Sequence, residues 1–148
     1  MKTKCWAAMS CCALVAACAP PPTTQVSPET MQIATAPLVC KDADECALWW
    51  RRAHDWVSHH ASYKLRSETD TLIETAGPAG GSGKLAYEIT KTPGGDGSAT
   101  IGFAARCDSM LGCDPNPWKA GADFKLYVRS GTEPPPGEPG EASPPPPR

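Results

Sequence analysis

Proline is concentrated in two segments of the chain, and their positions limit which residues can build a hydrophobic core. Residues 18–37 are rich in proline and threonine and have little hydrophobic periodicity, which is typical of a tether. Residues 132–148 are a low-complexity mixture of proline, glycine and glutamate, which we expect to be disordered. As an extended polyproline II helix this tail would reach roughly 50 Å and could serve as a spacer. We therefore expect residues 38–131 to form a single folded domain.

The hydrophobic pattern of residues 38–131 predicts an α+β domain. In residues 45–61, apolar and small side chains recur at every third or fourth position, which is the spacing of one helix face. Asn116 followed by Pro117 is typical of a helix start, and Gly131 of a helix end. Between the two helices lie four strand-like segments: 62–67, 70–75, 84–90 and 98–106. We expect a helix, a four-stranded antiparallel β-meander and a second helix, with both helices packed on one face of the sheet.

The patterns also predict which side chains face the core. The first helix carries Trp49, Trp50 and Trp56, and we expect all three to be core residues. Trp118 is expected on the buried stripe of the second helix. On the exposed face of the sheet, a plausible docking surface would contain Lys64, Arg66, Glu88 and Thr90.

Residues 1–17 have the pattern of a bacterial export signal. Lys2 and Lys4 precede an uncharged apolar stretch that is shorter than the roughly 20 residues needed to span a bilayer. It ends in Leu-Val-Ala-Ala-Cys, residues 14–18, which resembles the lipobox of bacterial lipoproteins. The resemblance implies cleavage before Cys18, a diacylglyceryl group on its thiol and an N-acyl chain on its amino group. This covalent lipid would hold the protein at a membrane, and no other cofactor is expected.

Two details bear on this anchor. Cys11 and Cys12 are rival lipidation points, but cleavage there would leave too short an apolar region, so Cys18 is favoured. The residue after Cys18 is Ala19, not aspartate. By the enterobacterial sorting pattern, this resemblance implies the periplasmic face of the outer membrane, with the inner membrane as the alternative. Three acyl chains would anchor the chain firmly, because stable attachment takes two or more.

The four cysteines of the predicted domain are Cys40, Cys46, Cys107 and Cys113, spaced as two C-x5-C pairs. An even number of cysteines in an exported chain predicts disulfides. The local pairing, Cys40–Cys46 with Cys107–Cys113, is favoured because it needs no long-range register, although two cross-linked pairings stay open. A tetrathiolate zinc site is the alternative, but its usual pairs are C-x2–4-C. The C-x-x-C pattern of a redox dithiol is absent.

Charge and motifs exclude several classes of function. The formal net charge is −2, and without residues 1–17 the chain has 12 basic residues (14 minus Lys2 and Lys4) against 16 acidic ones. With no basic stripe, nucleic acid is not an expected partner. Residues 77–85 resemble a phosphate-binding loop only superficially, because Pro78 stands where the motif needs its first glycine.

Histidines and carboxylates give the only hint of catalysis. His54, His59 and His60 lie near the end of the first helix, but their spacings of five and six differ from the i, i+4 spacing of helical metal ligands. Glu68, Asp70 and Glu74 could supply a carboxylate pair. No nucleophile–base motif accompanies them, so we predict neither catalytic nor metal-binding residues, and no enzyme activity.

The pattern "WWRRAHDWV…TDTLIET…LAYEITK…CDSMLGCDP" resembles, more loosely, a family of small Gram-negative envelope lipoproteins without assigned function. The resemblance implies no active site. We expect a lipid-anchored binding or assembly module that faces the periplasm and has an envelope protein as its partner. The alternative is a small cell-envelope hydrolase or metal-dependent enzyme that uses the region of His54, His59 and His60.

Overall fold

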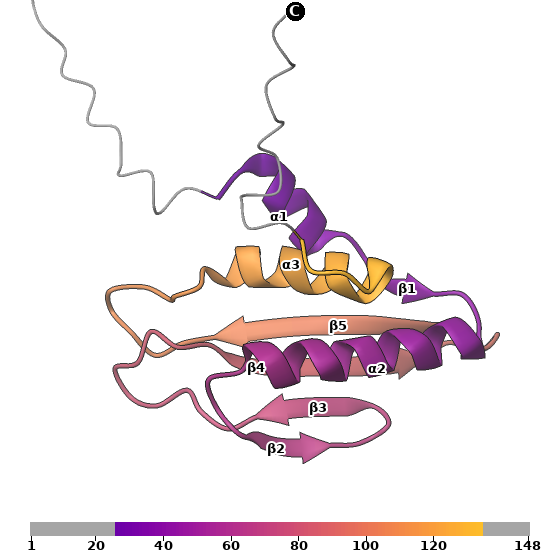
Figure 1. Ribbon diagram of the computed structural model, residues 1–148, viewed down its shortest axis with the longest axis horizontal. Helices are drawn as coiled ribbons and strands as arrows, with labels where there is room; N and C mark the ends of the chain where they lie inside the picture. Colours follow the sequence, from indigo (N-terminus) through magenta and orange to yellow (C-terminus); the bar gives the residue numbers. More distant parts are fainter. Residues whose placement is uncertain (1–25, 135–148) are drawn as a thin grey trace, which may run out of the picture.

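The computed structural model describes residues 26–134 (Figure 1). The predicted signal peptide 1–17, Cys18 and most of the predicted proline-rich tail lie outside the described residues. The elements in chain order are α1 (Pro28–Thr35), β1 (Val39–Cys40), α2 (Ala43–His60), β2 (Leu65–Glu68), β3 (Leu72–Thr75), β4 (Ala86–Pro93), β5 (Ala99–Arg106) and α3 (Pro117–Ser130). None of the helices within residues 26–134 is long and apolar enough to cross a bilayer.

The two long helices begin and end where local sequence signals place them. The Asp42 side chain accepts a hydrogen bond from Glu45 N (2.9 Å) and caps the start of α2. Asn116 caps α3 in the same way, with Trp118 N as the donor (2.9 Å). Gly131 ends α3 in the left-handed conformation (φ 76°), which glycine adopts without the steric cost of a Cβ atom.

The strands form one antiparallel sheet in the order β1-β5-β4-β3-β2. The predicted α+β class and the antiparallel meander from β2 to β5 are confirmed. The predicted number of strands is wrong, because β1 adds a fifth strand beside β5, with Cys40 opposite Ala99. A two-residue strand has no alternation to detect, and only its long-range partner defines it.

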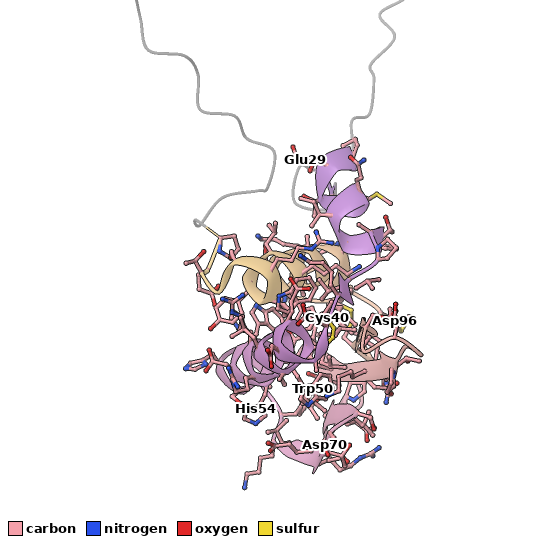
Figure 2. The ribbon with its side chains drawn as sticks, turned by 90° about the vertical axis from the view of Figure 1, so that its right-hand side faces the viewer. Glu29, Cys40, Trp50, His54, Asp70 and Asp96 are labelled. Carbon is pink, nitrogen blue, oxygen red and sulfur yellow. A yellow bond between two sulfur atoms is a disulfide. The ribbon has the colours of Figure 1, made fainter. Side chains whose placement is uncertain are left out.

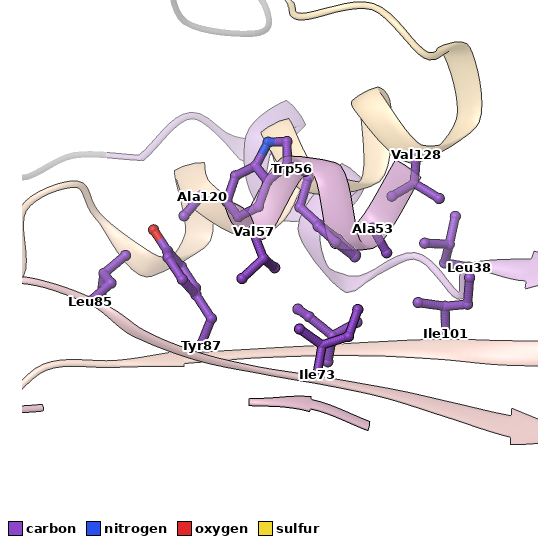
Figure 3. Close-up of a cluster of buried hydrophobic side chains, with 12 residues drawn as sticks. Leu38, Ala53, Trp56, Val57, Ile73, Leu85, Tyr87, Ile101, Ala120 and Val128 are labelled. Carbon is purple, nitrogen blue, oxygen red and sulfur yellow. The ribbon is translucent and has the colours of Figure 1, made fainter. Parts of the chain in front are cut away.

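Helices α2 and α3 pack side by side on one face of the sheet, as predicted (Figure 1). Trp56 of α2 lies at the centre of the core, with its ring centroid 5.4 Å from both Tyr87 and Phe124. Figure 3 shows Trp56 and Val57 above the sheet and Tyr87 and Ile73 directed up from the strands. Burial of a large side chain stabilises a fold by about 1.5–3 kcal/mol, so this layer dominates the stability of the domain.

The predicted tether at residues 18–37 needs correction. Its second half is folded, because Pro28–Thr35 forms α1 and this helix packs on α3 (Figure 1). The Ser27 side chain accepts a hydrogen bond from Thr30 N (3.1 Å), and Pro28 occupies the first helical turn, where its missing N–H is not needed. The folded unit therefore starts about ten residues earlier than the predicted boundary at Leu38.

Long-range contacts from α3 hold the end of α1. Lys125 is 93% buried and its Nζ donates to the carbonyl oxygens of Ala34 and Ala36, the latter at 2.6 Å. One residue further, Pro37 O accepts a hydrogen bond from Arg129 Nη2 (3.0 Å). Burial, with a smaller effect from the charge of Arg129, lowers the pKa of Lys125.

The four cysteines within residues 26–134 form two disulfides, in the local pairing that was favoured from their spacing. Cys40–Cys46 joins β1 to the first turns of α2, and Cys107–Cys113 closes the loop between β5 and α3. Each bridge closes a short loop, for which chain entropy accounts for about 2 kcal/mol of stabilisation.

Candidate functional site

An open groove of about 590 Å³ lies between α2 and the hairpin formed by β2 and β3. Figure 2 shows Trp50 and His54 projecting from α2 toward the hairpin, where Asp70 lies in the connecting turn. The groove is lined by Trp50, Arg51, His54, Asp55, Glu68, Thr69, Asp70 and Ile73.

The helical repeat explains how α2 contributes to this groove. Trp50 and His54 are four residues apart and therefore lie on one side of the helix, one turn from each other. That side borders the buried face, which carries Ala53 and Val57 in the core. Both groove residues are consequently half-buried, in contact with the domain at their base and with solvent above.

Two polar contacts connect α2 with the hairpin across the groove. Trp50 Nε1 donates to Thr69 O (3.3 Å), and His54 Nε2 lies 3.1 Å from Glu68 Oε1. On the Trp50 ring lies the ammonium group of Lys91, 4.8 Å from the centroid, at a distance that gives a favourable cation–π interaction. These contacts fix the indole and the imidazole relative to the hairpin.

The carboxylate of Asp55, in the lining of the groove, contacts two other side chains. One of its oxygens accepts a hydrogen bond from the hydroxyl of Tyr127, and the other lies 3.5 Å from His59 Nδ1. The hydrogen bond to Asp55 is the main reason that the pKa of Tyr127 is raised, because only the neutral phenol can donate it; desolvation and the charge of Asp55 add to the shift. Asp55 and Tyr127 thus link α2 to α3 beside the groove.

The predicted histidine cluster is divided by the structure. Only His54 lines the groove. His59 Nδ1 bonds to Asp55 O (2.8 Å), whereas His60 Nδ1 bonds to Trp56 O (2.8 Å) and its ring stacks on Trp56 at 4.2 Å. These contacts hold His59 and His60 at the end of α2, outside the lining of the groove.

The candidate carboxylates are divided as well. Glu68 and Asp70 line the groove, but Glu74 points to the opposite face of the sheet, where it pairs with Arg66. Glu88 lies beside Glu74 in register on that same face, which α2 and α3 leave uncovered. The predicted docking surface therefore has both charges, and it is separate from the groove.

The lining of the groove is mostly polar and carries charges of both signs. Its lining combines an aromatic ring with cationic Arg51 and the carboxylates of Asp55, Glu68 and Asp70. The hydroxyl of Thr69 accepts from Leu72 N (3.0 Å) and so shapes the hairpin turn. Within residues 26–134, no three histidine, cysteine or acidic side chains are grouped so that they could hold a metal ion.

The expectation that Trp50 belongs to the core is only partly right, and Trp118 is 45% exposed. Successive residues on a helix differ in direction by about 100°, so Trp49 and Trp50 cannot both point to the centre of the core. Both rings are half-buried and pack against the main core cluster, Trp49 also packs against the smaller cluster around Cys40 and Cys46, and Trp50 in addition lines the groove. The step of about 100° between neighbouring helix positions could have been applied to the sequence to predict that the two rings point in different directions.

Comparisons with known proteins identify no relative. No family model matches the chain, and neither a curated protein nor a solved structure shows significant similarity to it.

Proposed function

We propose that the chain is a lipid-anchored binding module of the bacterial envelope, with the groove between α2 and the β2–β3 hairpin as its ligand site. The lipobox-like residues 14–18 support the anchor. The observation that carries the binding role is the groove itself, which has ligand dimensions and brings Trp50 together with charges of both signs.

The lining indicates the chemistry of the ligand. Arg51 suits an acceptor such as a carboxylate, while Glu68 and Asp70 suit donors such as an ammonium or amide group. The indole of Trp50 offers apolar contact between them. A polar segment of an envelope protein that carries donors and acceptors a few ångströms apart would match this arrangement.

Site-specific photocrosslinking in living cells tests the groove. A photoreactive amino acid at Asp70, inside the groove, should give one defined crosslinked envelope protein. The matched position is Thr92, which is exposed and lies in β4 outside the groove lining. The Asp70 product should disappear when Arg51→Glu or Glu68→Lys is added. A product at Thr92 that is insensitive to both substitutions would contradict the proposal and point to the open sheet face.

Mass spectrometry of protein purified from membranes without reductant tests the anchor separately. The expected result is a triacylated Cys18 at the amino terminus, with Cys40–Cys46 and Cys107–Cys113 oxidised. An unmodified Met1 with free thiols would refute both export and anchoring.

A second candidate function rests on the 3.1 Å contact between His54 and Glu68. A carboxylate can orient an imidazole that acts as a general base, so a hydrolase acting on envelope material is the alternative. In that case His54→Gln and Glu68→Gln should abolish hydrolysis of purified cell-wall fragments, while the exposed pair contributes little to stability. Absence of hydrolysis by the unmodified protein would eliminate this candidate.

A further inference from the structure

The loop between β5 and α3 presents two fully exposed apolar side chains. Met110 is 104% exposed and Leu111 is 100% exposed, far more than any other large apolar residue of the described chain. They are adjacent in sequence and stand at the apex of the segment closed by the Cys107–Cys113 disulfide. We call these two residues the tip.

The tip is held in place by its surroundings. On one side of it, Asp108 N donates to Ser82 O (3.0 Å), and on the other, Asp114 N donates to Gly83 O (2.9 Å). Both anchor points belong to the neighbouring loop that leads into β4. With the disulfide, these bonds fix the base of the loop, so the tip pays little ordering entropy when it meets a surface.

We propose that the tip inserts into the surface of the lipid bilayer to which the chain is anchored. The inference rests on the lipid-anchoring part of the proposed function and is independent of the groove. Transfer of apolar side chains out of water is favourable, and residues 26–134 bury neither of the two side chains of the tip.

The length of chain between Cys18 and the folded unit favours a bilayer over a soluble partner. The eight residues 18–25 span at most roughly 28 Å when fully extended. Because α1 folds onto α3, the predicted twenty-residue tether is reduced to this short connection. A domain of this size has a radius of gyration of about 13 Å, so the surface of the folded unit is held within reach of the lipid headgroups.

The charges around the tip indicate which lipids it would meet. Arg106, Asp108 and Asp114 flank it and sum to −1. The contact should therefore depend on apolar insertion and require no anionic lipid, in contrast to surfaces that bind through clustered lysines and arginines.

Oxidation of methionine by a bulky, membrane-impermeant oxidant measures the contact directly. The chain from Ala19 to Arg148, which keeps all of residues 26–134, is attached through an amino-terminal histidine tag to phosphatidylcholine vesicles with nickel-chelating lipid. Burial of one large apolar side chain lowers the fraction of molecules with that side chain in water about tenfold. Because only those molecules react, Met110 should oxidise at least about tenfold more slowly on vesicles than in solution. Met31 on α1, 42% exposed, lies close to the attached end and is the internal reference for protection by mere proximity to the vesicle, so its rate should fall much less than that of Met110.

Two substitutions make the test specific. Leu111→Ser should restore most of the oxidation rate of Met110, whereas Leu48→Ser, at an exposed apolar position of α2, should leave the protection intact. Equal rates for Met110 on vesicles and in solution would overturn the proposal and point to a protein pocket as the target of the tip. Since the tag replaces the natural anchor, an unlipidated Cys18 would refute the anchoring without affecting this measurement.

Discussion

Replacing Lys125 by methionine should release α1 from α3 while the remaining domain stays folded. Lys125 is buried, and its ammonium group donates to the carbonyl oxygens of Ala34 and Ala36 at the end of α1. These carbonyls have no following helical turn to bond them, because α1 ends at Thr35. Methionine keeps the apolar stem and removes both donors.

The magnitude follows from two opposing effects. A hydrogen bond to a charged group contributes about 1.5–3 kcal/mol, so two such bonds represent about 3–6 kcal/mol. The loss of these two bonds is partly offset, because the substitution also removes the cost of burying an ammonium group. This cost is evident from the lowered pKa of Lys125. We expect a net loss of about 2 kcal/mol, which raises the population with α1 released about thirtyfold.

Amide hydrogen exchange resolves this local event from global unfolding. In Lys125→Met, exchange at Met31 N and Ala36 N, which bond to Ser27 O and Gln32 O, should accelerate about thirtyfold. The matched control is Lys119→Met, because Lys119 pairs with Asp123 within α3 (3.2 Å) and should not affect α1. Unchanged exchange in α1, or equal acceleration in α1 and β4, would refute the reasoning.

Three further predictions concern the core and the loops. Burial raises the pKa of Tyr87 to about 12, so the stability that its neutral phenol contributes should be lost as the pH rises from 10 to 12, by about 2 kcal/mol in urea titrations. Tyr87→Phe should remove this contribution, and a loss of stability from pH 10 to 12 that is as large in the variant would contradict it. The double substitution Cys107→Ser with Cys113→Ser should lower the free energy of unfolding by about 2 kcal/mol. A loss under about 0.5 kcal/mol would show that the hydrogen bonds to Ser82 and Gly83 hold residues 107–113 in place without the disulfide. Gly131→Ala should cost about 1–2 kcal/mol in the same assay, because the residue has φ +76° and a Cβ atom would meet the guanidinium of Arg52 at 2.8–2.9 Å. A stability equal to that of the unmodified protein would contradict this conformational and steric argument.

Several features of the fold could be predicted because short-range interactions define them. The start of α3 depends on Asn116 and Pro117, and its end on Gly131, all within one helical turn of the boundary they set. Leu85, Tyr87 and Ile89 alternate with polar or small residues in the predicted strand segment 84–90, and all three are buried. The disulfide pairs join residues six apart, so their pairing required no knowledge of the sheet.

The candidate site could be predicted only in part from short-range sequence signals. His54, Glu68 and Asp70 were recognised as residue types able to do chemistry, but the sequence grouped His54 with His59 and His60. The hairpin turn brings Glu68 back beside α2, fourteen positions away from His54, and no local pattern encodes that distance.

The sequence by itself determined the helices α2 and α3, the meander and the local disulfides, because caps, periodicity and short loops act over a few residues. Only the tertiary structure shows that Pro28–Thr35 is a helix, because its amphipathicity is weak. Lys125 of α3 donates hydrogen bonds to the carbonyl oxygens at the end of this helix. The same holds for β1 and for the groove. Each of these features depends on groups far apart in the chain, and the interactions that stabilise it form only once packing has brought those groups together.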